Sequence, residues 1–195
     1  MVSGPAGSGK GTVLARLLQN GKYRYSVSAT TRAPRPGEVN GVNYHFLTRE
    51  GFEERIARGE MLEYTEYCGN YYGTPKKEAE AVLAEGYHLL LEIEVEGAAN
   101  VKRIYPEAVT IMLLPPNHAV QEERLRGRGT ETEEKIQARL AQARQEIKCV
   151  KDYDYVVYNY DGQVEQAAED IRAIVRAESC SLCRNPDAEQ RFFGA

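Results

Sequence analysis

Apolar residues along this chain follow two different spacings. Continuous apolar runs at 87–93 and 109–114 are typical of strands buried on both faces. Shorter segments at 23–29, 61–67 and 154–158 also have the composition of strands. Between these runs, apolar residues recur every three or four positions, as in amphipathic helices. This alternation of strand and helix predicts an α/β fold in which helices cover both faces of a parallel sheet.

Four helical stripes can be read directly from the spacing. They comprise Val13, Leu14, Leu17 and Leu18; Phe52 and Ile56; Ile136, Leu140, Ala143 and Ile147; and Val164, Ala168, Ile171 and Val175. The expected boundary signals are Gly21 and Gly59 at helix ends, Thr74-Pro75 at the start of a helix that runs to Gly86, and a capping box of Thr130 with Glu133. The segment 30–42 is polar, and the chain from residue 178 onward is expected to be a frayed polar tail.

The segment 4–12 is the most informative part of the sequence. Gly4, Gly9 and Lys10 fit the spacing G-x-x-x-x-G-K, in which backbone N–H groups surround phosphate oxygens. Glycine is needed because side chains would block this approach, and the lysine supplies a mobile charge for the outer phosphates. The helix that follows directs its N-terminus at the same anion. The predicted phosphate-binding residues are Gly4, Pro5, Ala6, Gly7, Ser8, Gly9, Lys10, Gly11 and Thr12.

Two features of this segment depart from the usual pattern. The position after the lysine, normally Ser or Thr, is Gly11, and Thr12 comes one residue later. We therefore assign no direct metal ligand and expect Mg²⁺ to be held through phosphates and waters near Thr12. Such a loop also normally follows a buried strand, and only residues 1–3 precede it. We expect most of that strand to be missing, which would leave the chain weakly active or prone to aggregation.

Composition narrows the functional class. The 195 residues are 42% hydrophobic and 28% charged with a net charge of −4, which is typical of a globular domain and argues against a broad nucleic-acid surface. The sequence contains no apolar run of membrane-spanning length and no signal peptide, so we expect a cytoplasmic protein. Cys180 and Cys183 form a single C-x-x-C pair, too few ligands for a structural zinc site. The four cysteines are expected to be reduced thiols.

Four segments in addition to the loop carry a family resemblance. They are SATTRAPRPGEVNGVNYHF at 28–46, LEYTEYCGNYYGTP at 62–75, LEIEVEGA at 91–98 and RGRGTET at 126–132. Together they resemble the guanylate kinases over about residues 2–178. The resemblance implies the fold of the nucleoside monophosphate kinases that carry a phosphate-binding loop. It further implies transfer of the γ-phosphoryl group of ATP to GMP, and to dGMP as well, in purine metabolism. It also implies a core at 1–29, 87–120 and 150–178, a GMP-binding insertion at 30–86 and a lid at 121–149, followed by a polar tail at 179–195.

The same resemblance assigns roles to individual residues. It implies that GMP is bound by Ser28, Arg32, Arg35, Tyr44, Glu63, Tyr72, Thr74 and Glu94, and that ATP is bound by the loop with Arg124 and Asn159. The residues implied in catalysis, with Mg²⁺, are Lys10, Arg32, Arg128 and Arg139. Two arginines three positions apart also suit a phosphate dianion on chemical grounds. Arg126 is expected to be an ordinary surface residue.

Three other functions compete with this interpretation. A catalytically silent module of the same family would bind protein partners, but the intact Gly9-Lys10 pair and the basic residues argue against it. An adenylate or pyrimidine nucleotide kinase would share the loop, but Glu63 matches the two adjacent donors of guanine. A nucleic-acid-binding ATPase is disfavoured because no basic face is evident. Glu96 and Tyr64 replace the glutamine and tryptophan usual in the family, and we expect neither to abolish activity.

Overall fold

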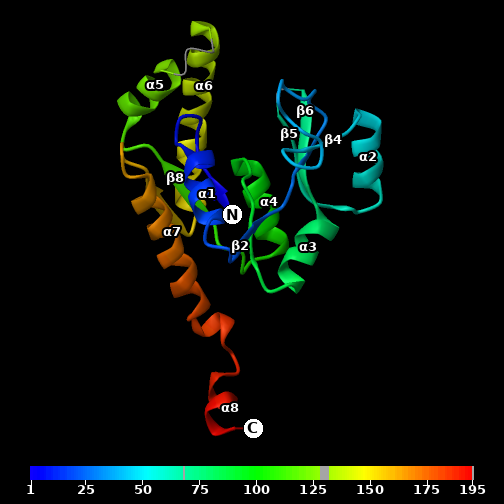
Figure 1. Cartoon of the computed structure of the whole chain (residues 1–195), viewed down its shortest axis with the longest axis vertical. Helices are drawn as coiled ribbons and strands as arrows, with labels where there is room; N and C mark the ends of the chain where they lie inside the picture. Colours follow the sequence, from blue (N-terminus) through cyan, green and yellow to red (C-terminus); the bar gives the residue numbers. More distant parts are fainter. Residues whose placement is uncertain (68, 128–131, 195) are drawn as a thin grey trace.

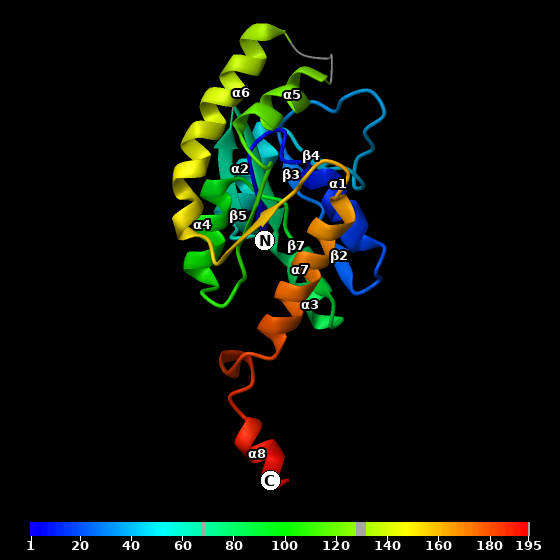
Figure 2. The same ribbon diagram turned by 90° about the vertical axis from the view of Figure 1, so that its left-hand side faces the viewer.

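The computed structural model describes residues 1–67, 69–127 and 132–194. A parallel sheet lies at its centre, flanked by helices (Figures 1 and 2). The strands of this sheet are, in spatial order, β2 (Tyr23–Tyr25), β7 (His88–Leu90), β1 (Val2–Ser3), β8 (Ile111–Leu114) and β9 (Tyr155–Tyr158). A single parallel bridge between Val2 and Glu92 joins the first two strands to the other three. The predicted fold class is therefore confirmed.

Alternate residues of the buried strands pack into two different cores. Leu90, Ile111 and Leu113 face one layer of helices, where they contact the stripes of α1 (Lys10–Leu18) and α7 (Val164–Ser179). Leu91 and Ile93, on the chain just after β7, pack with the opposite layer. That layer contains α4 (Val95–Ile104) and α3 (Lys76–Ala84). Burial on both faces explains why these strands are continuously apolar in sequence.

A second, smaller sheet lies beside the first. It contains, in spatial order, β4 (His45–Phe46), β3 (Ala29–Thr30), β6 (Asn70–Pro75) and β5 (Met61–Tyr67), with α2 (Arg49–Ala57) packed against it. The β5–β6 and β3–β6 pairs are antiparallel, and the β3–β4 pair is parallel. The hairpin of β5 and β6 aligns Glu63 with Thr74, which places two polar side chains next to each other in the interior.

Two helices project beyond the phosphate loop at the top of the view in Figure 1. They are α5 (His118–Gly127) and α6 (Glu133–Glu146), and a 3-10 segment, η1 (Ile147–Asp152), continues the second. Leu125, Ile136 and Leu140 form a small core between them, with Ala6 of the loop packed against it. The helices therefore contact the loop through apolar residues. Where the core, insertion and lid begin and end stays a prediction.

Several boundary predictions were wrong. The expected strand at 23–29 is divided into β2 and β3, which belong to different sheets because the chain crosses from one to the other at 26–28. The helix predicted from Thr74-Pro75 begins one residue later than expected, with Pro75 as the N-cap of α3, because the buried Thr74 hydroxyl ends strand β6 and donates to Glu63 instead of capping the helix. The expected capping residue Thr130 lies outside the described residues, and Thr132 occupies the N-cap position of α6. Ile147 is more than a third exposed, beyond the buried stripe.

The carboxyl-terminal segment is more regular than expected. After α7 ends at Ser179, the chain forms a short 3-10 turn, η2 (Leu182–Arg184), and then helix α8 (Ala188–Phe193). Figure 1 shows α8 extending away from the body of the molecule. Cys180 and Cys183 are exposed free thiols, and Cys149 is also a free thiol, as predicted for these three. No helix of the described chain has the length and apolarity needed to cross a lipid bilayer.

Strand β1, which precedes the phosphate loop, is present but is only two residues long. Val2 and Ser3 pair with Ile111 and Met112 of β8, and Val2 N–H donates to Leu91 O at 2.9 Å on the other side. Two residues of strand are thus enough to place the phosphate loop at the carboxyl edge of the sheet. The consequences expected for stability and activity stay predictions.

We predict that core packing around β8 dominates stability. Replacing Leu113, which is completely buried, with Ala should lower the free energy of unfolding by about 2–5 kcal/mol because a cavity replaces packed atoms. Leu182→Ala is the matched control, since that side chain is 79% exposed. Urea denaturation of both variants measures the difference. Equal stability of the two variants would contradict the placement of Leu113.

Candidate active site

The phosphate loop lies in close contact with the end of β8. A Cβ atom on Gly4 would lie 2.1 Å from the carbonyl oxygen of Leu113, so no other residue fits there without moving the backbone. Lys10 is the first residue of α1, and its Nζ donates to the Gly4 carbonyl across the loop. The loop and its lysine therefore form one compact unit at the N-terminus of a helix, where partial positive charge favours anions.

The other end of the loop is held by the residue that follows β9. Asn159 is buried, and its Nδ2 donates to Ser8 O at 2.9 Å. Gly9 has a φ of 85° and would place a Cβ 2.3 Å from Asn159 Nδ2, so both conformation and space require glycine. Asn159 thus supports the backbone of the loop directly.

Helix α5 supports the loop from the third side. Gln121 is almost fully buried, and its Nε2 donates to Ala6 O at 2.8 Å. Arg124 donates to the carbonyl oxygens of Gly7 and Asn159, at 3.3 and 2.8 Å, and pairs with Asp161 at 2.5 Å. Sequence reasoning selected Arg124 but missed Gln121, because a single glutamine in a polar helix carries no pattern.

A small cavity of about 130 Å³ opens in front of the loop. The charged residues that line it are Lys10, Arg139, Glu94 and Glu146, with Gly4, Ala6 and Gln142 completing the wall. Glu94 occupies the N-cap position of α4, and its side chain is exposed to the cleft. The protein around the Glu94 carboxyl nevertheless desolvates it and raises its pKa, while Lys10 opposes this shift and Glu146 adds to it. Positively and negatively charged side chains therefore lie together in the cavity in front of the phosphate loop.

The small sheet carries a second polar site. Arg32 makes a two-pronged ion pair with Glu38, at 2.9 and 3.0 Å, and its guanidinium carbon lies 5.4 Å from the centre of the Tyr44 ring. Tyr44 and Tyr72 meet edge to face, with ring centres 6.2 Å apart. Arg32 and the two tyrosines are thus brought together. Arg35 is exposed, and only its backbone N–H donates to Glu38, at 2.7 Å.

Deeper in the same sheet lies a buried carboxylate. Glu63 is 5% exposed, and its Oε1 accepts a hydrogen bond from Thr74 Oγ1 at 2.8 Å. Burial raises the pKa of Glu63, and the hydrogen bonds from Thr74 only partly oppose that rise. Gly97 of α4 makes room for the group, because a Cβ there would lie 2.8 Å from Glu63 Oε2. A buried acid with spare acceptor capacity is suited to a ligand that brings N–H donors.

The comparisons with known proteins agree with this geometry. Residues 1–178 match the family model described as guanylate kinase. The chain belongs to the guanylate kinase family. A guanylate kinase of Halalkalibacterium halodurans is 52% identical over 92% of this chain and 88% of its own length, and one of Clostridioides difficile is 48% identical over 94% and 89%. The crystal structure of guanylate kinase from Anaplasma phagocytophilum is similar with a TM-score of 0.76 and 38% identity, over 94% of this chain and 86% of that one.

Two predicted site residues, Ser28 and Arg128, and the predicted surface residue Arg126 remain to be placed. Ser28 lies at the start of the small sheet, where its carbonyl accepts a hydrogen bond from His45 N at 2.9 Å. Arg128 lies outside the described residues. Arg126 is a surface residue that pairs with Glu122 at 2.8 Å and also with Glu133, as predicted for this member of the guanylate kinase family. Glu38, like Gln121, was not predicted, because an acidic residue in a polar loop has no distinguishing spacing.

We predict that Glu63 lowers the stability of the ligand-free protein. Because its pKa is raised above the ordinary 4.5, the folded state binds more protons than the unfolded state just above pH 4.5, and stability falls as pH rises through that window. Glu63→Gln removes this penalty. The variant should melt about 2–4 °C higher than the parent at pH 7, with the difference shrinking toward pH 4. Thermal unfolding across this pH range tests it, and a variant that melts lower at pH 7 would contradict the burial argument.

Proposed function

We propose that the cleft between the phosphate loop, the small sheet and helix α6 is where this chain carries out its reaction. As a member of its family the chain is an ATP:GMP phosphotransferase, which transfers the γ-phosphoryl group of ATP to GMP and forms ADP and GDP in purine nucleotide metabolism. We expect dGMP to be accepted as well. The observation that carries the assignment of sites is that helix α4 connects the two: its N-cap Glu94 lines the cavity in front of the anion-binding loop, and its Gly97 lies against the buried Glu63 carboxylate.

The small sheet supplies the GMP site in this proposal. Guanine presents N1–H and N2–H₂ side by side, and the Glu63 carboxylate presents two acceptors to them, with Thr74 orienting it. Adenine has an acceptor at N1 and would leave a buried carboxylate facing a lone pair, at a cost of about 1–3 kcal/mol. Ser28 and Glu94 complete the proposed nucleoside contacts.

The phosphate of GMP is proposed to bind at the arginine and tyrosine cluster. Arg32, Arg35, Tyr44 and Tyr72 supply the donors. Glu38 holds the Arg32 guanidinium by the same two-pronged geometry that a phosphate would use, and it also accepts from the Arg35 backbone. The carboxylate of Glu38 thus occupies the position of an anion on this cluster, and phosphate binding requires Arg32 to exchange one anion for another.

ATP is proposed to bind on the opposite side of the cleft. Its phosphates enter the loop at Gly4–Thr12, where the N-terminus of α1 and Lys10 meet them. Arg124 and Asn159 hold the loop from outside and lie on the side where the adenine would bind. Lys10, Arg32, Arg128 and Arg139 are proposed to neutralise the transferred group. Phosphoryl transfer of this kind depends on position and charge rather than covalent catalysis.

A general base is not required. A phosphate monoester has its second pKa near ~6, so the acceptor phosphate of GMP is mainly a dianion at neutral pH and already nucleophilic. The protein has instead to hold two anions together and to exclude water, which would otherwise accept the phosphoryl group. The contact of Ala6 with the small core of α5 and α6 links the lid helices to the loop.

Mg²⁺ is proposed to accompany ATP. Among the described residues, no cluster of three or more acidic, histidine or cysteine side chains could hold a metal ion. The donor set present near the loop is the exposed Thr12 hydroxyl, which suits an ion that keeps several waters and binds mainly through phosphates. When bound, Mg²⁺ supplies charge neutralisation between the outer phosphates.

The role of Glu63 can be tested by kinetics. Glu63→Gln should lower kcat/KM for GMP by roughly 10²-fold, because the amide puts a donor opposite a donor of guanine. KM for ATP should stay near the parent value. A coupled assay with GMP, dGMP, AMP and UMP measures both effects. Equal losses toward both substrates, in a variant that remains folded, would overturn the assignment of Glu63 to guanine.

The proposed donor-side cations make a separate prediction. Lys10→Ala and Arg139→Ala should each reduce kcat by about two orders of magnitude or more, because they act on charge that grows in the transition state. Arg126→Ala is the matched control: within the part of the chain that the structure describes, this arginine pairs with the surface residues Glu122 and Glu133, so kcat should change by no more than a few-fold. An essential Arg126 and a dispensable Arg139 would reverse this interpretation.

A further inference from the structure

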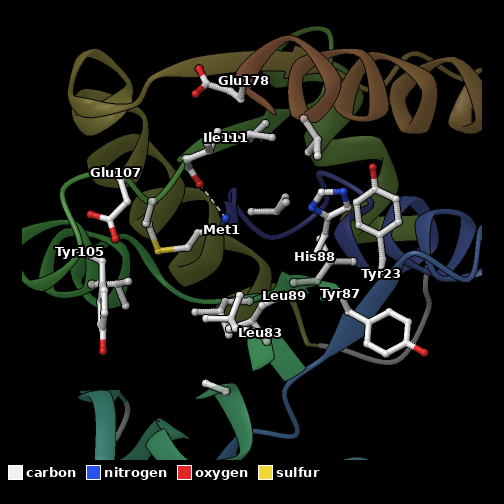
Figure 3. A pocket seen from close by; sticks show the side chains of 18 of the residues that line it. Met1, Tyr23, Leu83, Tyr87, His88, Leu89, Tyr105, Glu107, Ile111 and Glu178 are labelled. Atoms are coloured by element: carbon white, nitrogen blue, oxygen red, sulfur yellow. Dashed lines mark hydrogen bonds between the residues drawn. The ribbon is translucent and has the colours of Figure 1, made fainter. Parts of the chain in front are cut away.

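Two further cavities are larger than the one in front of the phosphate loop. One, of about 430 Å³, lies at the amino end of the central sheet and has a mainly apolar wall; Figure 3 shows Met1, Leu83, Leu89 and Ile111 around it. The other, of about 420 Å³, is a groove formed by β5, α4, the end of α6 and η1. In Figure 2 this end of α6 descends next to α4. We call this second cavity the α4–α6 groove.

Carboxylates dominate the wall of the α4–α6 groove. They come from all four of its elements and are Glu66, Glu94, Glu96, Glu146 and Asp152. Within the described part of the chain, no lysine or arginine lines the groove. Two of the carboxylates have cations near them outside the groove: Arg49 pairs with Glu66 at 3.1 Å, and Lys10 lies beside Glu94 in the cavity in front of the phosphate loop. The groove itself is therefore negatively charged.

Glu146 is the carboxylate for which this charge is most costly. The residue is 9% exposed, and no hydrogen bond or ion pair joins its carboxylate to another described residue. It lines both the groove and the cavity in front of the phosphate loop. Burial raises the pKa of the neighbouring Glu94, and repulsion from Glu146 adds to that rise. A buried carboxylate in this situation is stabilised by a ligand that brings positive charge and N–H donors.

The arrangement of the carboxylates indicates which kind of cation fits. Among the described residues, no three acidic, histidine or cysteine side chains come together as a metal site, so a single Mg²⁺ or Ca²⁺ ion finds too few ligands. The negative charge is instead spread along the groove. The same wall carries the apolar side chains of Val95, Ala98 and Ala99. Dispersed carboxylates with apolar surface between them suit a flexible chain that alternates ammonium groups with methylene segments.

Polar side chains in the groove offer further acceptors to such a ligand. Gln142 and Gln145 of α6 are exposed along it, and their amide oxygens accept hydrogen bonds. Thr65 Oγ1 donates to Glu96 Oε2 at 3.0 Å, which holds that carboxylate at the wall and leaves its other oxygen for a ligand. An ammonium group carries three N–H donors and needs several acceptors at once.

We propose that the α4–α6 groove binds a linear aliphatic polyamine. Its ammonium groups pair with Glu146, Glu96 and Asp152, and its methylene segments pack on Val95 and Ala98. A bound polyamine connects α4 to α6 and η1, and so joins the helix that carries the Glu94 N-cap to the predicted lid. This binding is separate from the proposed phosphotransferase activity and requires no nucleotide.

Calorimetric titration of the nucleotide-free protein with spermidine tests the proposal. At low ionic strength one spermidine should bind per chain with a Kd below about 1 mM, and added NaCl should weaken the binding. Spermidine should also raise the melting temperature of the protein. Putrescine has one ammonium group fewer and should bind more weakly. Butylamine, which has a single ammonium group, should bind at least about tenfold more weakly than spermidine.

Variants of the groove locate the binding site. Glu146→Gln should weaken spermidine binding by about tenfold or more, because the ion pair lost is a buried one. Glu96→Gln should weaken it by about two- to fivefold, because Glu96 is exposed. Gln145→Lys places a protein ammonium group at the exposed rim of the groove and should also weaken binding. Glu189→Gln is the matched control, since Glu189 is an exposed acid on α8, outside the groove.

Three results would overturn the proposal. One is equal affinity for spermidine in the parent, Glu146→Gln and Gln145→Lys proteins when all three are folded by circular dichroism. Another is binding of several spermidines per chain without saturation, which indicates general attraction to an acidic surface. The third is MgCl₂ binding in the groove as tightly as spermidine, which indicates a metal site. None of these outcomes bears on phosphoryl transfer, which the kinetic variants of Glu63, Lys10 and Arg139 test separately.

Discussion

The architecture depends on how closely the phosphate loop approaches the elements around it. The loop touches the end of β8, the helix α5 and the residue after β9, in each case at a distance that leaves no space for a side chain or is bridged by one hydrogen bond. These three elements come from parts of the chain more than a hundred residues away in sequence from the loop. The loop has its supporting contacts only where the folded sheet brings these elements together. The anion site is therefore a product of the tertiary structure rather than a local turn.

Electrostatic repulsion is the second constraint on this fold. Two phosphate-bearing substrates have to meet, and the cavity proposed to receive them contains Glu94 and Glu146. In the ligand-free structure these acids lie near Lys10 and Arg139, and Glu38 pairs with Arg32 in the same way. The cations of the site are thus accompanied by protein carboxylates before any phosphate arrives. In the proposed binding mode substrate oxygens replace these carboxylates, which limits the energy gained from any single contact.

The sequence specifies some parts of this structure more strongly than others. The G-x-x-x-x-G-K spacing and the stripes of α1, α6 and α7 could be predicted because each is a local pattern with one physical cause. Strand β6 and helix α4 were not predicted because some of their residues are determined by contacts with Glu63 and not by the local pattern. Thr74 donates a hydrogen bond to Glu63 instead of capping a helix, and Gly97 leaves room for the Glu63 carboxylate. Gln121 contacts Ala6, which is far away in sequence, and Glu38 contacts Arg32 within one loop. The residue type alone does not reveal either partner.

Burial disfavours one charged group in the small sheet, at the active-site end of the molecule, and another at the amino end of the central sheet. At the active-site end, burial disfavours the ionised form of Glu63, and nothing among the groups that shift its pKa is a cation. A ligand with N–H donors supplies hydrogen bonds that the protein does not make to this carboxylate, so in the proposed function the unfavourable burial serves guanine recognition. At the other end, the Met1 amine is buried beside an apolar cavity with a backbone carbonyl as its acceptor. Desolvation disfavours the charged form of both groups, and at Glu63 the N–H donors of the proposed guanine ligand offset that cost.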